Sequence, residues 1–274
     1  YGTAWPDPPR HEPGCRPGTA YCDPVSLVIS LFRSLVFGGF QTASLVVWAT
    51  LFISTAPLLS QRNRYRLAMK WPAMTVVAAR FLLGISWKVE GLQHLEAAKD
   101  QRLIVCAKHQ SSWETLFLPS FLPSPLCFVF KQELLRIPFF GWAIGLLDMI
   151  HINRRDGRDA YQSIAAQAQT KLDQGRWITF FPEGTRTPPG ERRRYKAGAA
   201  RLAIDLGVPV LPIALNSGLL WPRNAFIKRP GCISVSIGEP VFPQSNETPE
   251  ALMSRIETFI ENETQRLSEP TVSS

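Results

Sequence analysis

A stretch of 28 residues near the amino end, from Ser34 to Gln61, contains no Asp, Glu, Lys or Arg. About 20 apolar residues span the hydrocarbon core of a bilayer, so this stretch is long enough to cross one. A cleaved signal peptide fits poorly, because its apolar region is shorter and begins closer to the amino end. Gly38, Gly39 and Gln41 interrupt the apolar character, so a re-entrant or interfacial helix is the alternative. The sequence predicts a transmembrane or membrane-embedded helix over residues 25–61.

The segments that flank this helix differ in charge. Residues 1–24 contain six prolines and three glycines without periodicity, which predicts a disordered tail. Four cations follow the uncharged stretch at once, whereas Arg33 is the one cation close to it on the amino side. The positive-inside rule then puts the residues after 61 in the cytoplasm. The four cations are Arg62, Arg64, Arg66 and Lys70.

A second apolar stretch runs from Trp71 to Trp87, but Pro72 breaks it and Arg80 lies near its centre. We interpret residues 62–87 as a basic, membrane-associated segment whose apolar part lies in the interface rather than crossing the bilayer. The alternative is that this stretch forms an ordinary buried helix of the domain that follows.

Apolar strand-like runs alternate with amphipathic helix-like runs over residues 88–274. The strand-like runs are Arg102–Lys108, Leu126–Lys131, Met149–Asn153, Trp177–Phe181, Pro209–Leu215 and Cys232–Gly238. The helix-like runs are Trp113–Phe121, Leu134–Leu147, Arg158–Gln174, Lys196–Leu206 and Pro249–Arg266. This alternation predicts an α/β domain with a mostly parallel sheet flanked by helices.

Polar residues follow several of the predicted strands at the point where each strand ends. They are His109, Lys131, Arg154 and the segment Glu183–Arg186. Ligands bind outside the carboxyl ends of the strands in open α/β sheets, so these residues are expected at one edge of the sheet. For any one of them the alternative is an ordinary solvated loop charge.

His109 and Glu114 form the first candidate pair. Residues five apart on a regular helix do not share a face, so the pair requires His109 to precede the helix. With Ser111 or Ser112 as the N-cap, Glu114 falls in the first turn and reaches back to the imidazole. A carboxylate bound to one ring nitrogen leaves the other nitrogen as a base. The alternative is a capping arrangement with an incidental histidine.

The segment Phe181–Arg186 is the second candidate. A glycine after a strand lets backbone N–H groups approach an anion, and Arg186 offers a bidentate fork for phosphate. Five cations follow between residues 192 and 201, within a chain that has 30 Lys and Arg against 22 Asp and Glu. Such a surplus suits a phosphate-rich partner, namely nucleic acid, an anionic membrane or a phosphorylated substrate. The alternative for the basic run itself is a solvated or membrane-facing surface.

Other chemistries have no support in the sequence. The five cysteines are scattered without a CxxC pair, so we predict no metal site. The sequence has no dinucleotide-binding fingerprint and no recognisable RNA- or DNA-binding motif. Nucleic acid is therefore not an expected partner.

Four blocks, in order and correctly spaced, resemble the glycerolipid acyltransferases typified by 1-acylglycerol-3-phosphate acyltransferase. They are HisGlnSerSerTrpGlu (109–114), LysGlnGluLeu (131–134) with IleProPhePheGlyTrp (137–142) and IleAsnArg (152–154), PheProGluGlyThrArg (181–186), and ValProValLeuProIle (208–213). The resemblance covers roughly residues 88–240. Two positions depart from the family pattern, which usually has Asp where this chain has Glu114 and often has Asn where it has Lys108.

The resemblance implies acyl transfer from acyl-CoA or acyl carrier protein to the hydroxyl of lysophosphatidate, giving phosphatidate. His109 would act as the base and Glu114 would orient it. Arg186, with Glu183, Gly184 and Thr185, would hold the acceptor's phosphate, assisted by Lys131 and Arg154. No cofactor is implied beyond the thioester co-substrate.

Two alternatives remain open at this point. The same chemistry on another acceptor, glycerol 3-phosphate or a lyso-aminolipid, fits the four blocks equally well. A non-catalytic lipid-binding or nucleic-acid-binding module is the alternative from another class. The implied partners are a lysophospholipid, an acyl thioester, membrane lipids and acyl carrier protein. The expected location is the membrane, with the catalytic domain of residues 88–274 on its cytoplasmic side.

Overall fold

A computed structural model of the chain describes residues 24–152 and 157–269. Within these ranges the strands form one sheet in the order β1-β7-β6-β2-β5-β3-β4. All neighbouring strands pair in parallel except β6 and β7, so the predicted mostly parallel α/β fold is confirmed. The strands are β1 (Ile85–Glu90), β2 (Ile104–Ala107), β3 (Leu126–Lys131), β4 (Ile150–Ile152), β5 (Trp177–Phe180), β6 (Val210–Leu215) and β7 (Gly231–Ile237). The predicted tail of residues 1–24 lies, except for Pro24, outside the described residues.

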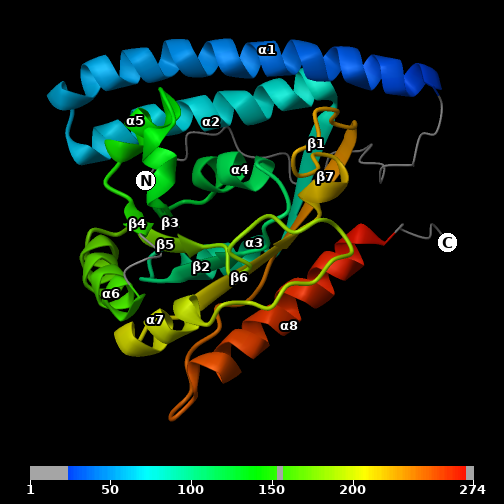
Figure 1. The fold of residues 1–274 in the computed structure, drawn as a ribbon. Helices are drawn as coiled ribbons and strands as arrows, with labels where there is room; N and C mark the ends of the chain where they lie inside the picture. The colour runs from blue at the N-terminus through cyan, green and yellow to red at the C-terminus, as the bar shows by residue number, and fades with distance from the viewer. Residues whose placement is uncertain (1–23, 153–156, 270–274) are drawn as a thin grey trace.

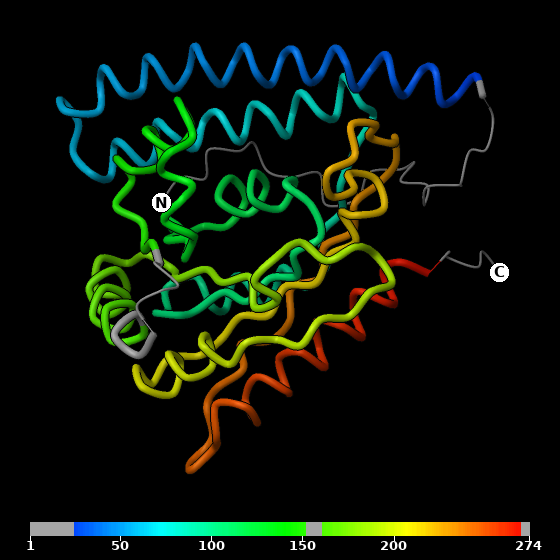
Figure 2. The backbone as a smooth tube through the Cα atoms, in the orientation of Figure 1, coloured from blue at the N-terminus to red at the C-terminus, as the bar shows by residue number. Residues whose placement is uncertain are grey.

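Helices cover both faces of the sheet (Figure 1). The helix α4 packs on one face, with α2 and then α1 stacked beyond it, and α6, α7 and α8 pack on the other. Figure 2 shows the same layers and the long antiparallel course of α1 over α2. The helices are α1 (Pro24–Thr55), α2 (Gln61–Leu83), α3 (Leu92–Ala98), α4 (Trp113–Phe121), α5 (Phe140–Gly145), α6 (Gly157–Asp173), α7 (Gly198–Leu206) and α8 (Pro249–Ser268).

The central strand β2 shows why the sheet is covered on both sides. All four of its residues are buried, and alternate side chains enter different cores. Val105 and Ala107 pack in the core beneath α4, whereas Ile104 and Cys106 pack in the core formed with α6, α7 and α8. A strand that buries both faces reads as an unbroken apolar run, which is what the sequence shows here.

The helix α1 packs along one side of the domain and leaves its opposite side apolar and exposed. Ser44 on α1 accepts a hydrogen bond from the Trp71 indole at 3.2 Å. Val28, Phe32 and Val47 are each at least 60% exposed. Among the described helices, α1 with the turn after it is long and apolar enough to cross a membrane, judged by length and composition alone.

The second apolar stretch, Trp71–Trp87, is not one element as the sequence analysis expected. The helix α2 runs through Pro72 and ends at Leu83, where Gly84 adopts φ +72° and caps it. Trp87 then belongs to β1, an edge strand that alternates apolar and polar residues and pairs with β7. Because α2 lies between α1 and α4, it is a layer of the domain rather than a separate interfacial segment. The sheet accordingly begins at Ile85, before the expected boundary at residue 88.

The predicted helix over residues 134–147 is also wrong in its extent. The helix α5 covers only Phe140–Gly145, and a short 3-10 turn occupies residues 132–136. Pro138 lies between them, and a proline disfavours the helical conformation of the residue before it and lacks a donor. Phe139 takes φ +61°, which also excludes a continuous helix.

Candidate active site

The carboxyl ends of four neighbouring strands meet at one edge of the sheet. β2 pairs in parallel with β5 and β6, and β5 pairs in parallel with β3. His109 follows β2, the loop of residues 181–187 follows β5, and β3 ends at Lys131. Parallel strands that lie side by side deliver their following loops to the same edge. The fourth strand, β6, adds Ser217, which the sequence analysis did not identify.

His109 lies in the turn between β2 and α4, and its imidazole contacts the Glu114 carboxylate. Ser112 is the N-cap of α4, and Glu114 lies in the first turn of that helix. The Nδ1 atom of His109 is 3.0 Å from Glu114 Oε1. This is the geometry under which the sequence analysis expected the carboxylate to reach the imidazole.

The Glu114 side chain is fully buried, and its two oxygens accept four hydrogen bonds. Oε1 accepts from His109 Nδ1 and, at 2.7 Å each, from the backbone N–H groups of Gln110 and Ser111. Oε2 accepts from the Ser217 hydroxyl at 2.8 Å. Burial by itself would raise the pKa of Glu114, but the imidazole and the backbone N–H groups hold that pKa below its usual range. The carboxylate is therefore charged at neutral pH.

The contact with Glu114 fixes the state of the His109 ring. Donation from Nδ1–H to the carboxylate leaves a lone pair on Nε2. The ring stacks on Phe181 with centroids 4.0 Å apart, and the Thr187 N–H donates to the His109 carbonyl at 2.7 Å. His109 also lines a large cavity. A held imidazole with a basic nitrogen at a cavity is placed to act as a general base.

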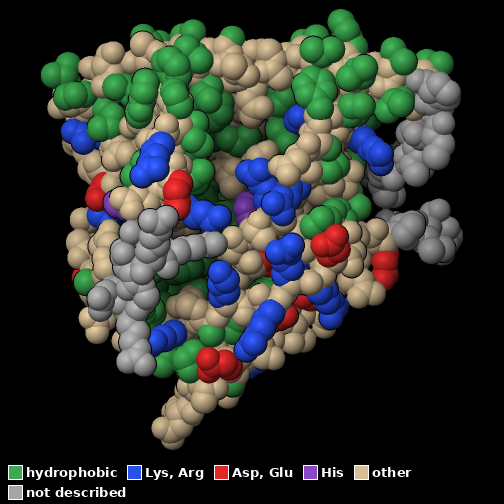
Figure 3. Space-filling model, in the orientation of Figure 1, with side chains coloured by type: hydrophobic (Ala, Val, Ile, Leu, Met, Phe, Trp, Pro, Cys, Tyr) green, Lys and Arg blue, Asp and Glu red, His purple; other side chains and the backbone are tan. Residues whose placement is uncertain are grey.

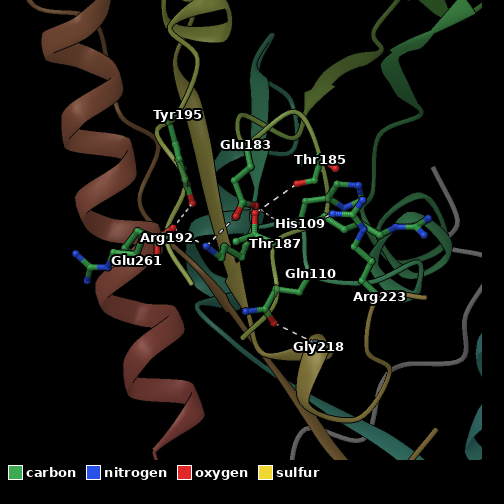
Figure 4. A network of polar contacts seen from close by, with 12 residues as sticks. His109, Gln110, Glu183, Thr185, Thr187, Arg192, Tyr195, Gly218, Arg223 and Glu261 are labelled. Atoms are coloured by element: carbon green, nitrogen blue, oxygen red, sulfur yellow. Dashed lines mark hydrogen bonds and ion pairs between the residues drawn. The ribbon is translucent and has the colours of Figure 1, made fainter. Parts of the chain in front are cut away.

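A buried ionic network lies behind His109 (Figure 4). Lys108 is 1% exposed, and its Nζ lies 2.9 Å from Glu183 Oε1 and 2.6 Å from Glu261 Oε1. The Tyr195 hydroxyl donates to the same Glu261 oxygen at 2.7 Å. Because Glu261 lies on α8, the last helix of the chain supplies a counter-ion at the end of β2.

The sequence analysis expected Glu183 to help hold a phosphate, but the structure directs its carboxylate into the protein. Oε2 accepts a hydrogen bond from the His109 backbone N–H at 2.6 Å, and Oε1 faces Lys108. Burial raises the pKa of Glu183, and the facing ammonium offsets this rise only in part. A carboxylate would also repel a phosphate. We therefore correct the assignment: Glu183 holds the backbone at His109.

The glycine of the same loop also has a local role. Gly184 takes φ +69°, and its N–H donates to the Phe181 carbonyl at 2.9 Å. A Cβ at this position would lie 3.2 Å from Lys196 Nζ. Gly184 thus closes a tight turn beside a cation, and its N–H stabilises that turn.

Other predicted phosphate ligands stand around the cavity that His109 lines. Thr185, Arg186 and Lys131 all line it, together with Gly184. The predicted ligand Arg154 lies outside the described residues. Among the described residues, no group of three or more His, Cys, Asp and Glu side chains is placed to hold a metal ion.

The cavity has a volume of about 910 Å³ and is lined mostly by apolar side chains. They include Trp48 and Phe52 of α1, Phe128 and Phe130 of β3, and Ile144 of α5. Figure 3 shows Lys and Arg side chains gathered around a recess below the hydrophobic surface of α1, with a histidine visible inside it. The site therefore joins an apolar chamber to a cationic rim.

The sequence analysis did not identify three residues that form part of the hydrogen-bond and ion-pair network around His109: Lys108, Ser217 and Glu261. Lys108 carried a signal, because a lysine directly before His109 is a departure from the family pattern. Ser217 and Glu261 had no such signal, because they are distant in sequence from the residues they contact. Ser217 lies 103 residues after Glu114, and Glu261 lies 153 residues after Lys108.

The comparisons with known proteins agree with this geometry. Residues 86–216 match the family model described as Acyltransferase. The chain is 40% identical over 225 residues to the 1-acyl-sn-glycerol-3-phosphate acyltransferase of Pseudomonas aeruginosa, which covers 82% of this chain and 86% of that protein. It is 33% identical over 167 residues to the human 1-acyl-sn-glycerol-3-phosphate acyltransferase alpha, covering 61% and 58% of the two chains. The crystal structure of the 1-acyl-sn-glycerophosphate (LPA) acyltransferase PlsC from Thermotoga maritima matches with TM-score 0.72 and 25% identity, over 88% of this chain and 98% of that one.

Two substitutions of Glu114 distinguish the effect of its negative charge from the effect of its size. Glu114→Gln keeps the volume but loses the negative charge that stabilises the imidazolium, so we expect kcat to fall by about 10²-fold or more. Glu114→Asp keeps the charge and is expected to retain substantial activity. Steady-state kinetics of both variants, with thermal unfolding as the folding control, tests this. Wild-type turnover in Glu114→Gln would show that the carboxylate does not assist His109.

Lys108→Met leaves two buried carboxylates without their shared cation, so we expect a loss of about 3–5 kcal/mol in the free energy of unfolding at pH 8. Removing the ammonium raises the pKa of Glu183 further. A carboxyl whose pKa is raised in the folded state gains stability from protonation, so the loss should shrink as the pH falls to about 5.5. Urea unfolding of the detergent-solubilised protein at both pH values measures it. Lys99→Met, which breaks an exposed pair with Glu96, is the matched control and should leave the free energy of unfolding almost unchanged, because solvent screens this pair. A pH-independent loss would contradict the role of Glu183.

Proposed function

The chain belongs to the family of 1-acyl-sn-glycerol-3-phosphate acyltransferases, as its four sequence blocks indicated, and we propose that it acylates lysophosphatidate to phosphatidate. The acyl group comes from a soluble thioester, acyl-CoA or acyl carrier protein. One observation carries the proposal. The His109–Glu114 pair, with Nδ1 3.0 Å from Oε1, and the Arg186 guanidinium stand at the same apolar cavity.

The chemistry needs a base rather than a protein nucleophile, because a thioester is already activated. The Nε2 atom of His109 removes the proton from the acceptor hydroxyl as its oxygen attacks the thioester carbonyl. The tetrahedral intermediate then expels the thiolate, which takes the proton from the imidazolium, and the ester remains. Glu114 stabilises the imidazolium while it exists. General-base assistance contributes roughly 10²–10⁴ in rate, and positioning of two bound reactants contributes about 7–11 kcal/mol to lowering the barrier.

The cavity suits the two apolar chains that such a reaction brings together. Its volume of about 910 Å³ lies within the range of ligand pockets that bury most of a small molecule. Aromatic side chains of β3 and α1 provide part of the apolar lining, whereas Arg186 and Lys131 supply cations at its edge. The alternative acceptors, glycerol 3-phosphate and lyso-aminolipids, share the hydroxyl chemistry but differ in chain or in charge.

We also propose that α1 lies along the membrane surface rather than across it. Its 32 residues are about 48 Å long, and it contacts the domain toward both ends. Ser34 accepts a hydrogen bond from the Lys228 N–H, and the Ala56 carbonyl at the end of the helix accepts from Arg64. If α1 crossed the bilayer, the parts of the domain that contact it, including the charged residues Arg64 and Lys228, would be drawn toward the hydrocarbon core, where charged side chains are costly. The interfacial alternative from the sequence analysis is therefore the one we adopt.

An in-plane α1 places the active site next to the lipids that supply its acceptor. The cations that follow residue 61 then lie at the membrane surface, where anionic lipid headgroups attract them. The catalytic domain faces the cytoplasm, where soluble thioesters reach it without crossing the bilayer. The membrane lipids and acyl carrier protein are partners under this proposal.

The function is tested by acylation of lysophosphatidate in membranes that contain the protein, with acyl-CoA and acyl carrier protein thioesters in separate assays. The wild type should form phosphatidate with at least one donor, and His109→Ala should lose at least about 10²-fold of that rate. Full activity in His109→Ala would make the histidine structural and the mechanism wrong. Transfer to glycerol 3-phosphate or to a lyso-aminolipid, but not to lysophosphatidate, would overturn the proposed acceptor.

The orientation of α1 is tested by spin labels at Val28, Leu35 and Val47, each introduced as a single reactive cysteine in vesicle-bound protein. An in-plane helix gives these three outward positions similar, shallow depths. A spanning helix gives depths that rise to the middle of the bilayer and fall again. Power-saturation measurements with oxygen and a water-soluble relaxing agent distinguish the two, and a depth gradient would exclude the proposed arrangement.

A further inference from the structure

Residues 216–230 connect β6 to β7 and are called the β6–β7 loop here. This loop contacts the turn that carries His109 and Glu114, and no sequence pattern predicted these contacts. Ser217 donates to Glu114 Oε2, and the Gly218 N–H donates to Gln110 Oε1 at 3.0 Å. The approach is close, because a Cβ on Gly218 would lie 2.9 Å from the Gln110 side chain. The start of the loop is therefore fixed against the turn that holds His109.

The far part of the same loop is fixed against α1. The Lys228 N–H donates to Ser34 Oγ at 2.9 Å, and Ser34 is fully buried. The Trp221 and Phe37 rings meet edge to face with centroids 5.2 Å apart. One loop thus joins the apolar helix to the catalytic turn.

A second cavity, of about 370 Å³, lies between this loop, Gln41 of α1 and Ser112 at the start of α4. It adjoins the apolar chamber, because Arg186, Arg223 and Asn224 line both. The second cavity thus borders the chamber that His109 lines.

Positive charge dominates the second cavity. Arg186, Arg223 and Lys228 line it, and none of its described lining residues is acidic. Lys228 is half-buried with its Nζ 5.1 Å from the centre of the Trp221 ring, and burial lowers its pKa. Three cations without a facing carboxylate are costly to hold together, and a bound anion relieves their repulsion.

Arg223 is a cation of the β6–β7 loop that lines both cavities. Its Nη1 donates to the Arg186 carbonyl at 2.8 Å, which ties the two arginines together. Figure 4 shows Arg223 extending from the loop toward the side of the site where His109 lies. A planar guanidinium binds phosphate oxygens in a bidentate manner, which a lysine does not reproduce.

We propose that the second cavity holds the phosphate-bearing headgroup of the acceptor and that Arg223 is a specificity-determining residue for it, an inference that rests on the proposed function. The phosphate sits among Arg186, Arg223 and Lys228, and the acceptor's hydroxyl reaches toward His109 past Arg186 and Arg223, which line both cavities. The donor's nucleotide is the other source of phosphate. The position of Gln41 favours the acceptor, because a lipid enters from the side of the apolar helix.

The test measures KM separately for lysophosphatidate and for acyl-CoA in Arg223→Ala and Arg223→Lys. Loss of hydrogen bonds to a charged group should raise KM for lysophosphatidate about 10- to 100-fold in the alanine variant, with the lysine variant intermediate. KM for acyl-CoA and kcat should stay within about twofold. Arg186→Ala serves as the reference for a lost cation at the rim. Arg229→Ala, an exposed arginine of the same loop that lines neither cavity, is the matched control and should resemble the wild type.

Three results would overturn the inference. One is Arg223→Ala behaving like Arg229→Ala. Another is an equal rise in both KM values. The third is a rise for acyl-CoA alone that disappears with acyl-pantetheine, a donor without nucleotide phosphates, which would give the cavity to the donor. If the wild type acylates glycerol 3-phosphate but not lysophosphatidate, the proposed function is wrong. The KM values of the Arg223 and Arg229 variants for glycerol 3-phosphate then still test whether the second cavity binds the acceptor's phosphate.

Discussion

The buried carboxylate of Glu114 is the interaction on which the site depends. Its four hydrogen bonds come from the imidazole, from two backbone N–H groups of the turn and from Ser217 after β6. A buried charge is stable only when its acceptor sites are filled, so these donors must all arrive together. The carboxylate therefore fixes the catalytic turn, the start of α4 and the β6–β7 loop in one arrangement.

The sequence predicted the parts of this site that depend on local pattern. Strand β2 buries both faces, and β2, β3 and β5 all stand out in the sequence as mostly apolar runs. The His109–Glu114 spacing required a strand-to-helix turn, which the structure contains. Contacts between distant segments have no such pattern, so Ser217 and Glu261 were missed. Glu183 was misassigned because its place in a phosphate-like loop says nothing about which way its carboxylate points. The sequence analysis did not predict the edge strand β1, because the apolar residues at the end of α2 and those of β1 form one continuous stretch in the sequence.

The two helices at the amino end change what a soluble α/β domain is able to do. The helix α2 is a layer of the domain, whereas α1 buries one side on it and presents an apolar side outward. The large cavity is lined partly by α1, so the exposed apolar surface and the chamber beside His109 share one helix. The same helix thus presents apolar side chains both to the outside and to the chamber beside His109.

The ion pair between Lys108 and Glu261 joins residues 153 positions apart and has a consequence for the order of assembly. During synthesis β2 leaves the ribosome well before α8, and folding proceeds from the amino end. Until α8 docks, the lysine beside His109 lacks one of its two counter-ions. The ionic network behind His109 is therefore complete only once α8, whose Glu261 lies 153 residues beyond Lys108, has packed against the sheet.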